Sequence, residues 1–218
     1  MIPPHVTLPT QPSRLIYRRT AIIASVSALA VAGVLWLVWP EGHGLVGYFL
    51  YAIPAHLLIS VVPNEPMLLA AAKTHAPMLV AIAGTAGCIV AICLDYALIG
   101  WLVNHRLVRR EIDDSGAFHW AQKYFGKAPF LLIVGSALLP VPFWPAKILG
   151  IVRDYPLWRF CVALIVGRLP RFYVWALLGQ RFKVPDSVLG SAGATLALIA
   201  GWGVWRTYRR NRQRATER

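Results

Sequence analysis

Long apolar runs separated by short polar breaks make up most of the chain. Four of these runs are uninterrupted and about 20 residues long, which is the length of a helix that spans a bilayer. The four runs are 21–39, 80–103, 157–179 and 187–205. Two further apolar regions, 44–79 and 129–151, are interrupted by prolines and polar residues. The pattern therefore predicts four transmembrane helices and two membrane segments of a different kind.

The second interrupted region contains the sequence GSALLPVPFWPAK at 135–147, with Pro140, Pro142 and Pro145 within six residues. Each proline lacks a backbone donor and clashes with the preceding turn, so a helix cannot continue through this block. Broken backbone inside hydrocarbon must be covered by protein or by a water-filled cavity. We therefore expect 129–151 to enter the membrane, turn and leave on the same side, as re-entrant segments of channels and transporters do.

The positions of the basic residues give these segments a direction. Arginines precede the first apolar run, lie in the 104–128 loop and follow the last run, and such residues mark the cytoplasmic side. The helix at 80–103 then runs from outside to inside, so the region 44–79 must begin and end outside. This region is predicted to be a second re-entrant hairpin, which opens toward the opposite face from 129–151.

The predicted fold is an all-α integral membrane protein with four transmembrane helices and two opposed re-entrant hairpins in an inverted repeat. Six plain helices are the alternative, which periodicity alone does not exclude. The predicted divisions follow the chain in order. They are a cytoplasmic tail at 1–20, a first transmembrane helix at 21–43, a central domain with both hairpins at 44–182, a last transmembrane helix at 183–205 and a basic cytoplasmic tail at 206–218.

Composition supports a membrane location. The chain is 57% hydrophobic and 14% charged, whereas soluble domains contain about 25% charged residues. The residues that give the net charge of +13 lie mainly beside the membrane segments. This placement indicates topology signals and contact with anionic lipid head groups, and argues against nucleic-acid binding. Cys88, Cys93 and Cys161 have neither disulfide nor zinc spacing and are predicted to be small packing residues. No metal or cofactor is predicted.

Five ionisable residues fall within the predicted membrane segments. Burying such a group costs at least about 2.5–3.5 kcal/mol at a helix centre, so each needs a partner or a cavity. The five are Glu65 at the tip of the first hairpin, Asp95 on the 80–103 helix, Lys147 after the second hairpin tip, and Arg168 and Arg171 on the 157–179 helix. Of these, Lys147 is expected to extend its ammonium group to the cytoplasmic interface.

Arg168 and Arg171 are three residues apart and share one helix face. Two arginines that face a cavity would bind a phosphate group in a bidentate manner. Alternatively they form structural ion pairs with Glu65 or Asp95. Both interpretations can hold together, because protonation of a carboxylate would release its arginine.

Small residues precede Asp95 at helical spacing, at Ala83, Gly87 and Ala91. Such a face allows close helix approach and directs Asp95 into the bundle. It suits a neighbouring helix of the same chain as well as one from a second copy, so self-association is left open.

These residues resemble those of the DedA/VTT-domain (SNARE-associated Golgi protein) family over roughly 45–182. The first loop, PNEPMLLAAA at 63–72, is similar to the family's first loop, and Glu65 stands at the position of the family's loop glutamate. The helix at 84–103, the proline-containing loop at 125–150 and the helix at 155–179 also resemble family segments.

The chain departs from many relatives in the second loop. Ser136 stands where they carry an arginine before the proline, and Val141 or Pro142 stands where they carry a second one. Arg168 and Arg171 resemble the pattern of a branch with a proline-rich second loop.

The resemblance implies a bacterial inner-membrane protein with twin re-entrant hairpins and cytoplasmic termini. It implies movement of a phospholipid or a polyprenyl-phosphate carrier lipid between leaflets, as a flippase or scramblase, with proton coupling in some members. The residues expected to bind the substrate are Arg168, Arg171, Lys147, Ser136, Pro140 and Pro142, and those expected to bind protons or form ion pairs are Glu65 and Asp95.

Two other function classes compete with lipid movement. A small-solute or ion secondary transporter would use the same broken helices. An intramembrane lipid phosphatase is less favoured, because the sequence shows no nucleophile–base constellation at the membrane interface. The prediction is therefore a transporter without catalytic residues.

Overall fold

The computed structural model describes residues 12–58, 63–102, 124–139, 141–153 and 155–182, and the single positions 191, 195 and 198. Within these residues the secondary structure is helical throughout. Helices α1 (Pro12–Val38), α4 (Pro77–Leu102) and α9 (Leu157–Phe182) each contain a stretch long and apolar enough to cross a membrane. The prediction of an all-α membrane protein is confirmed. The predicted helix at 187–205 lies outside the described residues apart from the three single positions.

Four α-helices of the described residues are too short to cross a bilayer. They are α2 (His43–Ala55), α3 (Glu65–Ala72), α7 (Pro129–Leu138) and α8 (Trp144–Val152). The longest of them, α2, has 13 residues and is about 20 Å long, against a hydrocarbon core of about 30 Å. The structure thus breaks both proline-interrupted regions into short helices, as the sequence predicts.

Prolines set the beginnings of several helices. Pro66 and Pro145 lie in the first turns of α3 and α8, and Pro77 and Pro129 are the first residues of α4 and α7. A proline in the first turn of a helix loses no hydrogen bond, because those N–H groups have no partner within the helix. The same residues that prevent a continuous span therefore begin the next helix.

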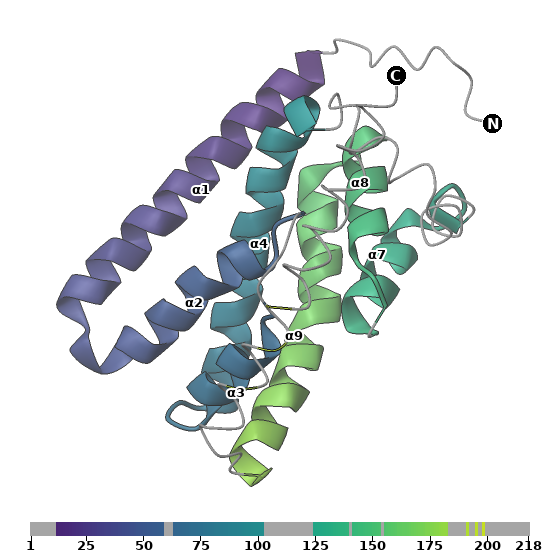
Figure 1. Ribbon diagram of the computed structural model, residues 1–218. Coiled ribbons are helices and arrows are strands. Elements are labelled where there is room, and N and C mark those ends of the chain that lie inside the picture. The colour runs from purple at the N-terminus through teal and green to yellow at the C-terminus, as the bar shows by residue number, and fades with distance from the viewer. Residues whose placement is uncertain are drawn as a thin grey trace, which may run out of the picture.

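Helices α4 and α9 lie side by side and antiparallel at the centre of the molecule (Figure 1). Gly84, early in α4, faces Phe172 in the second half of α9. Tyr96, late in α4, packs edge-on against Phe160 near the start of α9, with ring centroids 6.0 Å apart. Both helices have 26 residues, so they form a matched central pair.

Among the described helices, the order of two short helices and one long helix occurs twice, as α2–α3–α4 and as α7–α8–α9, and each set is called a repeat below. The first short helix of each repeat packs on its own long helix at a glycine. A Cβ atom on Gly87 would lie 2.7 Å from the Cβ of Ala52, and one on Gly167 would lie 2.7 Å from the Cβ of Ala137. In each case a backbone carbonyl three residues earlier, of Phe49 or Val134, closes the same space. Both contacts require glycine, because any side chain would separate the helices.

The second short helix of each repeat crosses to the other repeat. Helix α3 packs against α9, where a Cβ on Gly179 would lie 2.9 Å from the Leu69 side chain. Helix α8 contacts α4, where the Tyr96 hydroxyl lies 3.5 Å from the position of a Cβ on Gly150. These contacts of α3 with α9 and of α8 with α4 join the two repeats into one core.

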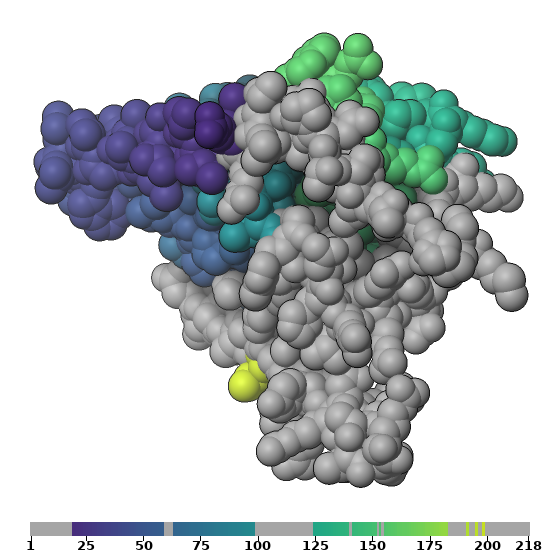
Figure 2. Space-filling view, turned by 90° about the horizontal axis from the view of Figure 1, so that it is seen from above, coloured from purple at the N-terminus to yellow at the C-terminus, as the bar shows by residue number. Residues whose placement is uncertain are grey.

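Helix α1 lies outside this core, against α2 and α4 (Figure 1). It forms one edge of the molecule, opposite the α7–α8 side (Figure 2). Its outward side chains are apolar, and Leu37 is 81% exposed. In a bilayer this face contacts lipid.

Candidate functional site

A buried ion pair joins the two repeats. The Nζ atom of Lys147 on α8 lies 2.5 Å from Oδ2 of Asp95 on α4, and both residues are buried. Lys147 also donates to the backbone carbonyl of His56, and the second carboxylate oxygen of Asp95 accepts the N–H of Leu58 at 3.0 Å. His56 and Leu58 follow directly on α2, so the pair also satisfies backbone groups where that helix ends.

The expectation that Lys147 extends to the cytoplasmic interface is wrong. Its side chain points from α8 toward α4, where a carboxylate and a carbonyl accept its protons. A buried ammonium group needs such partners, and they lie far away in the sequence. Asp95 is therefore paired with a lysine and not with an arginine.

A second ion pair mirrors the first. Arg171 on α9 lies 3.7 Å from Glu65 on α3, measured from Nη2 to Oε1. The Nη1 atom of Arg171 donates to the carbonyl of Leu139 at 3.0 Å, directly after α7. This pair is more accessible than the first, because the Glu65 side chain is 46% exposed. The predicted pairing of Glu65 with an arginine of α9 is present.

The two pairs follow one rule. In each repeat the charged residue of the long helix, Asp95 or Arg171, satisfies the backbone just after its own first short helix. It also pairs with an opposite charge, Lys147 or Glu65, from the second short helix of the other repeat. An acid satisfies the free N–H in one repeat, and a base satisfies the free C=O in the other. The broken backbone is thereby stabilised in a setting without bulk water.

Arg168 has no such compensation. The residue is 8% exposed, and its guanidinium lies 5.0 Å from the ring centroid of Phe143 and 5.7 Å from that of Phe172. Among the described residues, its Nε atom has no hydrogen-bond partner and no carboxylate forms an ion pair with it. A buried charge in this state is costly unless something else neutralises it.

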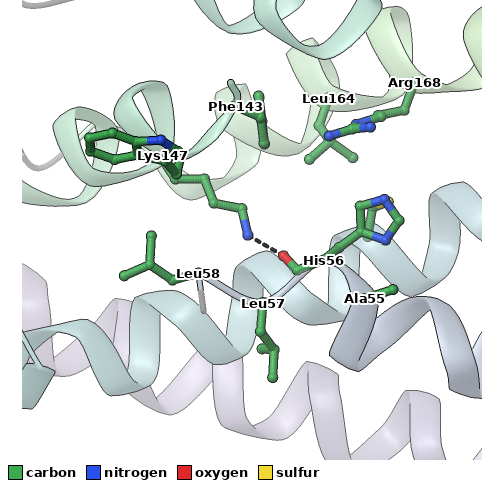
Figure 3. Close-up of a pocket in the computed structure, with 10 residues that line it drawn as sticks. Ala55, His56, Leu57, Leu58, Phe143, Lys147, Leu164 and Arg168 are labelled. Atoms are coloured by element: carbon green, nitrogen blue, oxygen red, sulfur yellow. Dashed lines mark hydrogen bonds between the residues drawn. The ribbon is translucent and has the colours of Figure 1, made fainter. Parts of the chain in front are cut away.

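Arg168 and Lys147 both line a cavity of about 230 Å³ (Figure 3). Their side chains extend from α9 and α8 toward His56 at the end of α2. The lining residues are Ala55, His56, Leu57, Leu58, Cys88, Phe143, Trp144, Lys147, Leu164 and Arg168. The cavity therefore lies where both repeats and both broken regions meet, with aromatic walls and cationic groups.

The other predicted site residues lie elsewhere. The Ser136 hydroxyl is buried and donates to carbonyls of its own helix, those of Leu132 at 2.7 Å and Ile133 at 3.1 Å. Pro142 is exposed and does not line the cavity, and Pro140 lies outside the described residues. Arg171 is absent from the cavity lining but is one helical turn from Arg168.

Sequence reasoning missed two buried polar side chains that keep an unsatisfied atom, Asn64 and Thr85. Asn64 donates through Nδ2 to the Tyr48 hydroxyl at 3.3 Å, but within the described part of the chain neither its Oδ1 nor the Thr85 hydroxyl has a partner. Asn64 belongs to the PNEP loop already singled out for Glu65, so its position was a usable signal. Thr85 sits in a run of small residues and offered none.

The cysteines do not form a metal centre within the described residues, where no group of three His, Cys, Asp or Glu residues could hold an ion. The side chains of Cys93 and Cys161 instead lie beside each other, between α4 and α9. Cys88 is buried beside the cavity.

Broken helices, a central cavity and buried charges that stabilise the helix ends define a transporter-like membrane protein. The family model of the VTT domain matches residues 62–181, more than half of the chain. The chain therefore belongs to the VTT-domain (DedA) family, as the sequence motifs indicate. Comparisons with curated proteins and with solved structures gave no match.

Proposed function

We propose that this protein moves a phosphate-bearing lipid, either a phospholipid or a polyprenyl phosphate, between the leaflets of a bacterial inner membrane. The observation that carries the proposal is Arg168, a buried cation without an anionic partner among the described residues, at a cavity between the two repeats. A phosphate is the anion that a guanidinium binds best, through two parallel hydrogen bonds.

The membrane arrangement that supports this function has α2–α3 and α7–α8 as opposed re-entrant hairpins. Their helices are too short to span, and the two long helices after them are antiparallel. The basic residues at 14–19, at the start of α1, and those between 104 and 128 favour cytoplasmic positions for those segments. Each hairpin then opens to one face, and the cavity lies between the hairpins.

In this mechanism the head group alone enters the protein. Arg168 binds the phosphate in the cavity while the acyl or prenyl tails stay in the bilayer. A cavity of about 230 Å³ is smaller than the roughly 300–1,000 Å³ of a site that encloses a whole ligand, as head-group binding requires. The Lys147–Asp95 pair holds the hairpins together around it.

Arg171 provides a second contact that can be made and broken. It is one turn from Arg168, and its partner Glu65 lies 3.7 Å away and is half exposed. Protonation of Glu65 would release Arg171 toward the phosphate, which is how a pH gradient could drive the cycle. The basic residues at 14–19 and in 206–218 would add attraction to anionic head groups at the membrane surface.

The test is leaflet exchange in liposomes that contain a fluorescent phospholipid or a fluorescent polyprenyl phosphate, with and without a pH gradient. Arg168→Ala and Arg171→Ala should slow the exchange, and Glu65→Gln should remove its response to the gradient. Arg159→Ala is the matched control, because Arg159 is an exposed arginine on the same helix. Exchange that is unaffected by Arg168→Ala would contradict the proposal.

A small-anion transporter is the second candidate, because the cavity is small and its free charge is positive. Uptake of radiolabelled phosphate into the same liposomes, without lipid exchange, would favour it. Release of free phosphate from the lipid would instead indicate an enzyme.

A further inference from the structure

The positive charges around the cavity outnumber the negative ones, and this difference bears on which lipid the cavity accepts. We propose that the site selects a phosphate head group with one net negative charge and no amine, as in a phosphodiester of a polyol. This inference rests on the proposed function and narrows its substrate class.

The count of charges is the first argument. Among the described residues at and beside the cavity there are three cations, Lys147, Arg168 and Arg171, and two carboxylates, Asp95 and Glu65. The carboxylates lie beside Lys147 and Arg171, which leaves one positive charge on Arg168. One phosphodiester brings one negative charge and makes the whole cluster neutral, which is the least costly state in a low dielectric.

The second argument concerns where a lipid ammonium group would lie. Asp95 is not among the residues that line the cavity, and its two oxygens each accept a hydrogen bond, from the N–H of Leu58 and from Lys147. An ammonium group beside the bound phosphate would therefore meet two cations, Lys147 and Arg168, and no available carboxylate of the described cavity lining.

Aromatic rings could in principle replace a carboxylate, because they attract cations through their faces. The Arg168 guanidinium already lies over Phe143 and Phe172, at 5.0 and 5.7 Å. A second cation at these rings would be repelled by the first. The site thus disfavours zwitterionic head groups on charge and not on size.

The experiment measures binding to the purified full-length protein in detergent. Dihexanoyl phosphatidylglycerol and dihexanoyl phosphatidylethanolamine share the glycerophosphate and differ in net charge and the amine, and inorganic phosphate is the third ligand. Calorimetry and thermal unfolding should show that the phosphatidylglycerol binds at least about tenfold more tightly than the phosphatidylethanolamine. Equal affinities, or a preference for ethanolamine, would overturn the inference. If inorganic phosphate binds as tightly as the phosphatidylglycerol, the assignment of a lipid head group as the ligand of the cavity would be overturned.

Two variants connect the preference to Arg168. Arg168→Gln removes the unpaired charge and should abolish the preference, whereas Arg168→Lys keeps the charge and should retain it at lower affinity. Arg159→Gln should leave the preference unchanged. Discrimination that survives Arg168→Gln in a folded protein would contradict the charge argument.

Binding and exchange fail separately. Preferential binding of the phosphatidylglycerol without any leaflet exchange would reject the proposed function and keep the inference about the site. Exchange that is equally fast for both lipids would reject the inference and keep the function.

Discussion

Lys147 and Asp95 form an ion pair of 2.5 Å although 52 residues separate them and they belong to different repeats. The pair also satisfies the backbone of His56 and Leu58 at the end of α2. One cluster of contacts therefore joins α8, α4 and the end of α2. Its removal should affect the whole molecule and not one helix alone.

The pair should behave as a coupled unit. Asp95→Asn or Lys147→Met leaves a buried charge without its partner and should lower the free energy of unfolding by about 3–5 kcal/mol. The double variant removes both charges and should cost less than the sum of the two single changes. Chemical unfolding of the four proteins in detergent measures this coupling, and strictly additive losses would show that the pair is not formed.

The helix contacts at glycine predict a second set of changes. Gly87→Ala and Gly167→Ala would each place a methyl group 2.7 Å from a neighbouring alanine, so each should destabilise the protein by about 1–3 kcal/mol. Gly135→Ala on α7 is the control, because nothing lies within 4 Å of its Cβ position, and it should be neutral or slightly stabilising. Thermal unfolding of the three variants measures these changes in stability. A similar loss of stability in all three would contradict the packing described.

The contact between Cys93 and Cys161 offers a way to lock α4 to α9. Mild oxidation of the two thiols should form a disulfide between these residues, identified by mass spectrometry of the digested protein. The proposed head-group cavity lies between the hairpins and does not require α4 and α9 to separate, so the locked protein should retain leaflet exchange. Loss of exchange on oxidation, restored by reductant, would show that the long helices must separate. A Cys161→Ala variant controls for other effects of the oxidant.

The proposed arrangement of opposed hairpins makes a prediction about accessibility. In a variant without native cysteines, single cysteines at the exposed positions Glu41 and Thr74 should react with a membrane-impermeant reagent only from outside. Cysteines at the exposed positions Gly126 and Arg153 should react only from the cytoplasmic side. If 129–151 were a plain spanning helix, Gly126 and Arg153 would react from opposite sides. Labelling of spheroplasts and inverted vesicles distinguishes the two arrangements.

The broken helices could be predicted because their causes are local. Pro145 prevents a continuous helix wherever the chain goes, and the length of an apolar run compared with a bilayer decides whether it spans. The pairing of Glu65 with Arg171 was also within reach, since few opposite charges are available in the membrane segments.

The partner of Asp95 could not be predicted in this way. Lys147 lies near the end of an apolar segment, and local sequence favours extension of its ammonium group to the interface. Only the packing of α8 against α4 shows that it turns inward. The unsatisfied atoms of Asn64 and Thr85 are likewise a property of packing, because polarity in sequence does not reveal what a side chain fails to contact.

The rate of leaflet exchange in Arg168→Gln relative to Arg159→Gln tests the central claim most directly. Both variants remove one arginine from α9, but only Arg168 is buried at the cavity. We predict that Arg159→Gln exchanges a fluorescent phosphatidylglycerol at the wild-type rate and that Arg168→Gln is slower by at least about tenfold. Equal rates for the two variants, in proteins of equal stability, would contradict the account.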